Sequence, residues 1–388
     1  MIPARSTVSC VLTPFDDYPI HQTPLPVAHP ATGDPNHYDR FWFNGYTEDV
    51  YFAAGMAVYP NRGIIDGAFA VVADGIQRSV FASGRVPEDR SQTRIGPLTI
   101  DVVEPLRVTR VRVDAADLGI DADVTFTART VALEEPRQTI TAGTKTVMDS
   151  TRLTQWGTWS GRLSAGGSDI PITNVYGTKD RSWGIRPVGE ATPAAPDTTL
   201  PQIFFLWAPI NWDDCCTHFL CFERSNGDRF VGSQAVLQII GEHDPTWGAD
   251  ATTRGIEHLA RTVTDVRWAP GLRRSEGATL RLVRHNGTEE RIDLEPLLTF
   301  RMRGLGYTHP EWGHGRWHSE HAVGSEEHHV ADLDNLEPWN IHIQQVMRAR
   351  WGDRVGLGVL EQLAFGEHTP TGLTGFLDGF AASPARPG

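Results

Sequence analysis

Hydrophobic and polar residues alternate along most of the chain from about residue 37 onward. In ADVTFTART, residues 122–130, the apolar side chains of Val124, Phe126 and Ala128 are separated by polar residues. A period of two places successive side chains on opposite faces of a β-strand. FWFNGYTEDVYFAAGMAVYP, residues 41–60, follows a similar period. No convincing amphipathic helix of ten residues stands out, so the pattern predicts an all-β protein.

Pairs of turn-forming residues separate these alternating runs. Asp-Gly occurs at 66–67 and 74–75, and Asn-Gly at 226–227 and 286–287. Both central residues of a type I′ turn need φ > 0, which Asn, Asp and Gly tolerate best. The spacing therefore predicts a series of antiparallel hairpins.

Composition divides the chain into five parts. Residues 1–36 are rich in Pro, Thr and His and lack periodicity, whereas GEATPAAPDTTLP, residues 189–201, has the composition of a linker. We predict an extended arm (1–36), a first domain (37–188), a linker (189–201), a second domain (202–380) and a flexible tail (381–388). The two domains are expected to be lipocalin-like antiparallel barrels or sandwiches in tandem.

Net charge and cysteine content limit the kinds of ligand and the cellular location that we expect. The chain has 388 residues and a formal net charge of −13, which repels nucleic acid and anionic membrane surfaces and favours an uncharged or cationic small molecule. No stretch is long and apolar enough for a signal peptide or a stable membrane insertion. The four cysteines match neither a metal knuckle nor a disulfide framework, so we expect free thiols in a cytoplasmic protein. A homodimer is compatible with this composition.

GTKDRSWGIRP, residues 177–187, places charged residues inside a predicted strand. Asp180 and Ser182 share one face, and Arg181 and Trp183 share the other. Asp180 is either a general acid or a structural acceptor. Its partner is expected from another strand, because alternation sends the Arg181 side chain to the opposite face.

RVGLGVLEQLAFGEH, residues 354–368, contains the second candidate acid. Glu361 interrupts a strand face that is otherwise apolar. Burial without a partner would raise the pKa of this carboxyl and suit it to general acid catalysis. The alternative is an ion pair with Arg301, Arg303, Arg348 or Arg350, which are close enough in sequence.

GLGYTHPEWGHGRWHSEH, residues 304–321, is the third candidate. His309, Glu311, His314, His318 and His321 lie within thirteen residues. Histidines and a carboxylate can bind a metal, but this spacing matches no established zinc pattern, so no metal is assigned. The other interpretations are a solvated loop leading into a strand, or a polar rim on an aromatic cavity. Walker, GxGxxG, GxSxG and HExxH motifs are absent from the sequence.

KDRSWG, FWFNGY, IGPLTIDVVEPLRVTRVRV and the late GLGYTHPEWGHG…GVLEQLAFGEHTPTGLTG together resemble the AttH-like, carotenoid 1,2-hydratase-related superfamily. Tocopherol cyclases and decalin-forming Diels–Alderases are similar at a greater distance. The resemblance covers about residues 37–380. It implies two calycin-like barrels with a ligand cavity in or between them. It also implies chemistry on large apolar, often isoprenoid molecules, in which aromatic faces stabilise a cation formed by protonation.

The leading hypothesis is a cofactor-independent lyase or cyclase that hydrates, dehydrates or cyclises an apolar, isoprenoid-like small molecule. Glu361 or Asp180 is its general acid. His314 and Tyr307 orient water or the substrate oxygen. The residues assigned to substrate binding are Trp183, Trp312, Arg181, His309, Trp159 and His368, of which Trp159 is alternatively a core residue. The competing hypotheses are a non-catalytic lipocalin-like binding protein, a pericyclase and a metal-dependent enzyme.

Overall fold

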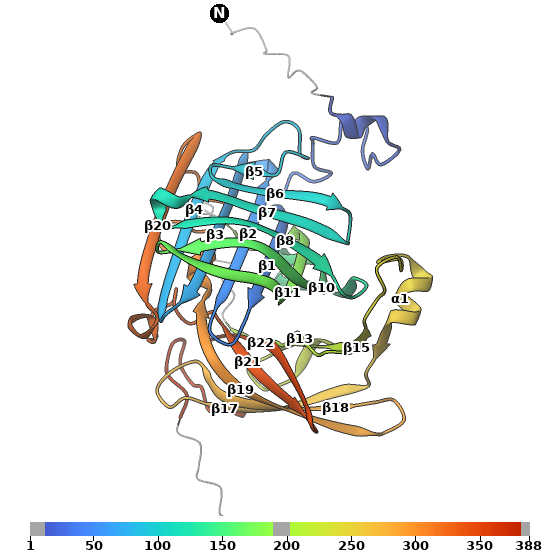
Figure 1. Ribbon diagram of the computed structural model, residues 1–388, viewed down its shortest axis with the longest axis vertical. Helices are drawn as coiled ribbons and strands as arrows, with labels where there is room; N and C mark the ends of the chain where they lie inside the picture. Colours follow the sequence, from blue (N-terminus) through green and yellow to red (C-terminus); the bar gives the residue numbers. More distant parts are fainter. Residues whose placement is uncertain (1–11, 189–201, 382–388) are drawn as a thin grey trace, which may run out of the picture.

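A computed structural model describes residues 12–188 and 202–381 of the chain, and in them nearly all regular structure is β. The strands form two antiparallel sheets that face each other, one of twelve strands and one of ten within these residues (Figure 1). This confirms the all-β fold class and the two tandem β units. Outside the sheets lie one helix and six short 3₁₀ turns: α1 (Ala249–Gly255), Pro14–Asp17, Pro60–Arg62, Ala116–Leu118, Met302–Leu305, Val330–Leu333 and Thr369–Thr371.

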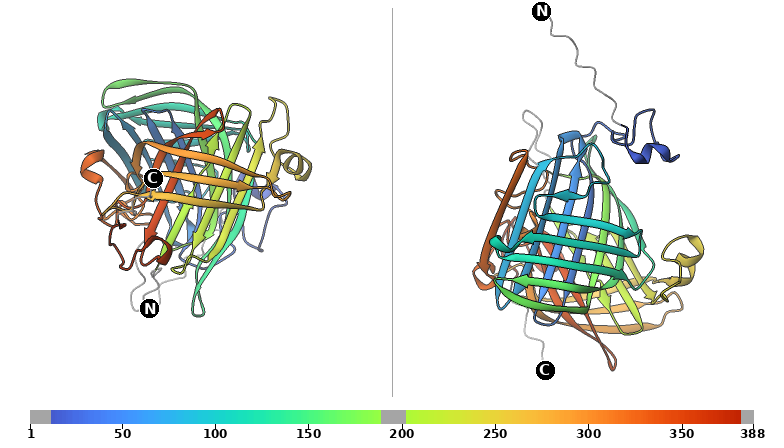
Figure 2. Two further views of the ribbon diagram at one scale, coloured as in Figure 1. Left: turned by 90° about the horizontal axis from the view of Figure 1, so that it is seen from below. Right: turned by 45° about the horizontal axis from the view of Figure 1, so that its top comes forward.

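The first sheet has the strand order β20-β4-β3-β2-β1-β11-β10-β8-β7-β6-β5, and β9 also pairs with β10. Its strands are β1 (His37–Tyr46), β2 (Tyr51–Tyr59), β3 (Ile64–Ala73), β4 (Ile76–Arg85), β5 (Arg94–Ile95), β6 (Leu98–Glu104), β7 (Val108–Ala115), β8 (Ile120–Ala128), β9 (Leu133–Ala142), β10 (Lys145–Ala165), β11 (Ser168–Ile185) and β20 (His321–His329). The sheet curves into a nearly closed barrel (Figure 2, right).

The second sheet has the order β16-β15-β14-β12-β22-β21-β19-β18-β17, with β13 pairing to β14 and β22. Its strands are β12 (Ile203–Trp207), β13 (Ile210–Asn211), β14 (Cys215–Glu223), β15 (Arg229–Gln238), β16 (Ile256–His258), β17 (Arg261–Trp268), β18 (Ser275–Val283), β19 (Glu289–Arg301), β21 (Ile343–Trp351) and β22 (Arg354–Phe365). The expected linker, 189–201, lies outside the described residues.

One strand from the second half of the chain belongs to the first sheet. β20 pairs antiparallel with β4, from His321–Gly84 to His329–Ile76. Without β20, β4 would be the edge of the sheet, with unpaired backbone groups open to other chains. A division of the chain at 189–201 therefore separates β20 from the sheet in which it lies.

The predicted turns form at three of the four sites. Asp74 and Gly75 both have positive φ between β3 and β4, and the two Asn-Gly pairs lie between β14 and β15 and between β18 and β19. The prediction for 66–67 is wrong, because Asp66 and Gly67 lie inside β3. There Leu98 packs over Gly67, and the Asp66 carboxylate accepts a hydrogen bond from the backbone N–H of Gly315.

Aromatic side chains fill the interior of the first barrel. Trp159 lies at the centre, with its ring edge-on to Phe43, Phe52 and Phe126 at centroid distances of 5.3–5.6 Å. Its indole N–H donates to the Asn44 carbonyl at 2.7 Å. The structure thus places Trp159 in the core, and the barrel interior is packed rather than open.

A row of three glycines makes room for these rings. Gly45, Gly177 and Gly157 lie opposite one another on β1, β11 and β10. A Cβ atom on any of them would overlap the ring of Phe52, Trp159 or Phe126, respectively.

We expect Gly157→Ala to destabilise the fold by about 1–3 kcal/mol, because a methyl group there must displace Phe126 from a packed core. Urea unfolding at neutral pH measures the change. Gly33→Ala is the control, since that position is open and exposed. Equal stabilities of the two variants would contradict the packing argument.

The outer face of β1–β4 packs against the second sheet through a further apolar cluster that includes Trp42 and Trp207, whose rings meet edge-on at 5.9 Å. Polar side chains also form hydrogen bonds between the two sheets. The Gln344 side-chain oxygen accepts hydrogen bonds from Asn44 at 3.0 Å and from the Tyr51 hydroxyl at 2.7 Å. These contacts fix the orientation of the Gln344 amide.

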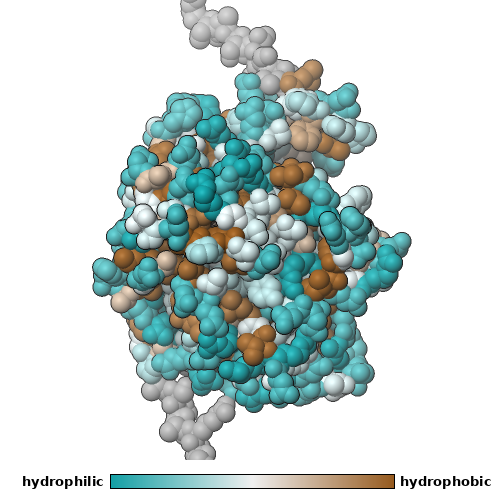
Figure 3. Space-filling view, in the orientation of Figure 1, coloured by the Kyte–Doolittle hydropathy of each residue, from teal (hydrophilic) through white to brown (hydrophobic). Residues whose placement is uncertain are grey.

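The surface in one view is mainly hydrophilic. Figure 3 shows hydrophilic residues over most of one face, with apolar residues in small separate groups. Among the described residues no helix has the length and apolar character needed to cross a bilayer.

Candidate functional site

A cavity of about 620 Å³ lies between the two sheets. Its volume falls in the range of small-molecule binding sites. Side chains from β1, β9 and β10 line one side, and side chains from β12, β14, β15 and β22 line the other, together with the loop 306–316. The cavity therefore lies between the two units rather than inside the first barrel.

The two ends of the cavity differ in chemistry. One end is aromatic and aliphatic, and its walls contain Ile140, Met148, Ile203, Phe204, Phe205, Phe222, Phe230, Leu363, Phe365 and Phe376. The other end is polar and contains Tyr38, Arg152, Arg186, Tyr307, His314, His342 and Glu361. A ligand that fills the cavity must be amphipathic.

A small polar chamber adjoins the polar end. Its volume is about 20 Å³, enough for about one water molecule. Asp180 and Glu361 both line it, and Arg152, Arg186 and Tyr307 line both the chamber and the cavity, as Glu361 does. The two candidate acids of the sequence, far apart in the chain, thus reach one chamber.

Glu361 lies on β22 and contacts a histidine rather than an arginine. Its Oε1 is 2.7 Å from His342 Nε2, and its Oε2 accepts a hydrogen bond from Gln344 Nε2 at 2.6 Å. Burial alone would raise the pKa of Glu361, but these hydrogen bonds outweigh burial and hold its pKa below the ordinary value. Glu361 is therefore ionised at neutral pH. The alternative of a paired carboxyl applies, although its partners are Gln344 on β21 and His342 just before that strand rather than an arginine.

Asp180 has the opposite electrostatics. Its side chain lies on the face of β11 that is turned toward the second sheet, opposite to Arg181 as alternation predicts, and its Oδ2 is 3.3 Å from Arg152 Nε. Arg152 comes from β10, which confirms the expectation of a partner from another strand. Burial raises the pKa of Asp180 above its ordinary value, although Arg152 and Arg40 act in the other direction. Asp180 is thus the carboxyl in the chamber whose pKa is raised.

Tyr307 lies among charged and aromatic groups. The Arg40 guanidinium lies 4.5 Å from the Tyr307 ring centroid, and the rings of His314 and His342 meet it edge-on at 4.5 and 4.7 Å. His314 Nε2 donates to the Leu305 carbonyl at 2.7 Å. Burial, with Arg40 and Arg186 nearby, holds the pKa of His314 well below the usual range, so His314 is a neutral imidazole.

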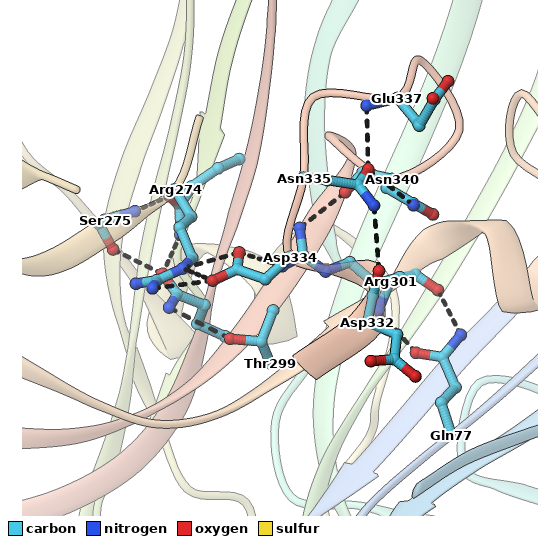
Figure 4. Close-up of polar contacts among 12 residues, drawn as sticks. Gln77, Arg274, Ser275, Thr299, Arg301, Asp332, Asp334, Asn335, Glu337 and Asn340 are labelled. Carbon is cyan, nitrogen blue, oxygen red and sulfur yellow. Dashed lines mark hydrogen bonds and ion pairs between the residues drawn. The ribbon is translucent and has the colours of Figure 1, made fainter. Parts of the chain in front are cut away.

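Three of the four arginines considered as partners for Glu361 are engaged elsewhere. Arg301 pairs with Asp334 at 2.6 Å, in a network that also joins its backbone to Gln77 on β4 (Figure 4). Arg303 pairs with Glu326, and Arg348 pairs with Glu48 and Glu295. These ion pairs connect strands and loops away from Glu361.

The remaining candidates lie in different places. Arg181 is on the face of β11 opposite to Asp180, the face that carries Gly177; it pairs with Asp39 at 2.8 Å and does not line the cavity. Trp183, on the same face as Arg181, is 39% exposed. Trp312 stacks on Phe81 and lies outside the cavity wall.

Two histidines from the sequence analysis support the cavity wall. His309 lines the cavity, but both ring nitrogens are used: Nε2 with Glu326 at 2.8 Å, and Nδ1 as acceptor from two backbone N–H groups. His368 stacks on Phe204 at 3.7 Å, behind the wall. No group of three His, Cys, Asp or Glu side chains suited to a metal ion occurs in residues 12–188 and 202–381.

Several cavity residues were not predicted from the sequence. His342 and Gln344 sit two residues apart in WNIHIQQVM, residues 339–347, where polar side chains alternate with isoleucines. Polar residues that interrupt an apolar strand are the same signal that identified Glu361. Arg152 and Arg186 carry no comparable local signal, because arginine is common on exposed strand faces.

Fold and cavity together define a class: an all-β protein of two facing antiparallel sheets, the AttH-like fold, with an amphipathic cavity between them. The crystal structure of a Nitrosomonas europaea protein provisionally assigned as AttH has a TM-score of 0.52 to this chain at 13% identity, covering 84% of this chain and 92% of that one. That likeness shows the fold. The structure of CghA aligns with a TM-score of 0.42 and 11% identity, over 85% of this chain and 88% of its own.

The chain belongs to a family of unknown function, DUF8625, which matches residues 12–374. No functionally characterised protein in the curated set matches the sequence.

Proposed function

We propose that the protein is a cofactor-independent enzyme that adds water to, or removes water from, an apolar small molecule by general acid–base catalysis. The observation that carries this proposal is the chamber for about one water molecule, which lies at the polar end of the cavity and is lined by Asp180 and Glu361. A substrate hydroxyl or a water fits there, while the apolar part of the substrate fits the aromatic end.

Two groups that differ in chemistry, Asp180 and His342, are proposed to transfer protons to and from the substrate. Asp180, with its raised pKa, gives a proton to a leaving hydroxyl in dehydration, and its carboxylate takes a proton from water in hydration. His342 donates its Nε2 proton to the ionised Glu361, which leaves Nδ1 to accept a proton from carbon. In dehydration, the C–H proton passes to His342, the C–O bond breaks, and the Asp180 proton leaves with the oxygen as water.

The surrounding charges favour one form of this chemistry. Three guanidinium groups, those of Arg40, Arg152 and Arg186, line the chamber. Preorganised cations stabilise negative charge that develops in a transition state, and they disfavour a carbocation. We therefore favour removal of a proton beside an electron-withdrawing carbonyl over protonation of an isolated alkene. The Tyr307 side chain, which borders both spaces, is placed to orient the reacting oxygen.

Incubation of the purified protein with a panel of apolar alcohols and unsaturated carbonyl compounds in ¹⁸O-labelled water tests the proposal. We expect at least one compound that binds to the protein to gain heavy oxygen, as measured by mass spectrometry. The alternative function, a binding protein, is favoured by the apolar walls of the cavity. Compounds that bind tightly, none of which exchanges oxygen, would support it and contradict the enzyme.

A further inference from the structure

Arg186 is a cation of the cavity wall without a counter-charge. It follows directly after β11, and its guanidinium lies 5.4 Å from the Tyr38 ring centroid and 5.6 Å from that of Tyr307. Among residues 12–188 and 202–381, no carboxylate lies within ion-pair distance of it and no side chain accepts a hydrogen bond from it. Its Nε is buried and unpartnered.

The nearby carboxylates have other partners. Asp180 is paired with Arg152, and Glu361 is held by His342 and Gln344. At the aromatic end, Glu223 pairs with Arg229 at 3.1 Å and lies 3.3 Å from His368 Nε2. A local excess of positive charge therefore remains at the polar end, in a chain whose net charge is −13.

An uncompensated guanidinium in a low-dielectric site costs free energy until an anion pairs with it. The two tyrosine rings lie near the Arg186 guanidinium, and they interact with its charge without accepting its N–H groups in the plane. The N–H groups in the plane of the Arg186 guanidinium therefore remain free to donate. Their geometry fits a carboxylate, which can accept two parallel hydrogen bonds from them.

A second cation lies further along the same wall. Arg316, in the loop 306–316, lines the cavity and donates from Nη1 to the Pro310 carbonyl, and no described carboxylate pairs with it. The phenylalanines of the aromatic end line the same cavity. Their position gives the ligand a direction, with its charged group toward Arg186.

We propose that the cavity binds an amphipathic carboxylic acid, whose carboxylate is held by Arg186 and whose apolar tail lies along the aromatic end. This rests on the proposed function in one respect, since the acid would be the substrate of the same site. It differs from the uncharged or cationic ligand expected from net charge, because the local charge of the cavity is opposite to that of the whole chain.

Competition with a dansyl-labelled fatty acid tests the proposal without any turnover. The competitors are dodecanoic acid, dodecanol, methyl dodecanoate, dodecyl phosphate and dodecylammonium, each below its micelle concentration. We expect dodecanoate to bind at least about tenfold more tightly than dodecanol or the ester, because a hydrogen-bonded charge pair is lost in both. Equal affinities, or tightest binding of dodecylammonium, would overturn the proposal. Tighter binding of dodecyl phosphate would overturn the assignment of the anion as a carboxylate.

Variants assign the effect to Arg186. Arg186→Gln should weaken dodecanoate by about 10- to 100-fold and leave dodecanol unchanged, while Arg186→Lys keeps part of the preference. Arg162→Gln is the matched control, since Arg162 is exposed and pairs with Asp121 on the barrel surface. An equal loss for dodecanoate and dodecanol in Arg186→Gln would contradict the assignment.

Stability separates binding from a structural role. Without ligand, Arg186→Gln should melt at the same or a higher temperature than the native protein, because it removes an uncompensated charge. A large fall in melting temperature would mean that Arg186 supports the fold. The binding and melting measurements do not depend on whether the protein adds or removes water. Oxygen exchange can be absent while dodecanoate binds through Arg186, and oxygen exchange can occur while dodecanoate shows no preference for Arg186, so the two proposals fail separately.

Discussion

Asp180→Asn is expected to reduce turnover by about 10²- to 10⁴-fold, the usual contribution of a general acid or base. Asparagine keeps the shape of the side chain and a hydrogen-bonding oxygen near Arg152, but it cannot exchange a proton. Ligand affinity should stay within a few-fold of the native value, since Asp180 lines the chamber rather than the cavity. Oxygen-exchange rates and dissociation constants, measured on the same preparations, separate the two effects.

Asp169→Asn is the control for this substitution, because Asp169 lies on the same strand, β11, and is exposed. The pH profile adds a second check. Burial raises the pKa of Asp180, so dehydration should slow as pH rises through that raised pKa, and this limb should disappear in Asp180→Asn. Unchanged turnover in Asp180→Asn would remove Asp180 from the mechanism.

Glu135→Gln is expected to abolish a pH dependence of stability worth roughly 3 kcal/mol. Glu135 lies on β9 and is fully buried against the second sheet. Burial raises its pKa to about 7, only partly offset by Arg152, whose Nη1 is 3.7 Å away. His218, at 3.7 Å, cannot compensate a negative charge, because burial lowers its own pKa to about 3 and keeps it neutral.

The direction of the change in stability with pH follows from the number of protons bound by the folded and unfolded chains. In the unfolded chain Glu135 titrates near its ordinary pKa of 4.5, so between about pH 4.5 and 7 the folded protein holds a proton that the unfolded chain has lost. Its contribution to stability is complete below pH 4.5 and is lost as pH rises through about 7. Urea midpoints at several pH values should decline across this interval in the native protein and decline less in Glu135→Gln.

Glu134→Gln provides a matched control, since Glu134 is the neighbouring residue on β9 and points to solvent. It should retain the native slope. If Glu135→Gln and the native protein lose stability in parallel between pH 5 and 8, Glu135 is ionised at low pH in the folded state and Arg152 compensates it fully.

The alternation of residues along a strand was informative wherever the position of a side chain depends on that strand alone. Alternation placed the Asp180 and Arg181 side chains on opposite faces of one strand, and their separate ion pairs, with Arg152 and with Asp39, agree. The same rule sent Trp156 and Trp159 to different sides of β10, where they enter two separate apolar clusters. The Asp-Gly prediction at 66–67 failed because close packing by Leu98, not a turn, is what places glycine there.

The sequence by itself determined the all-β class, most hairpins, the opposite faces of Asp180 and Arg181, and the apolar strand face that carries Glu361, because side-chain alternation and turn conformation are properties of neighbouring residues. Only the tertiary structure decided the rest. It joined β20 to the first sheet, brought two carboxyls into one chamber, and gave Glu361 a histidine and Asp180 an arginine. Since a carboxyl's pKa depends on burial and on nearby charges, which come from distant parts of the chain, the sequence could identify the two acids but not which of them has the raised pKa.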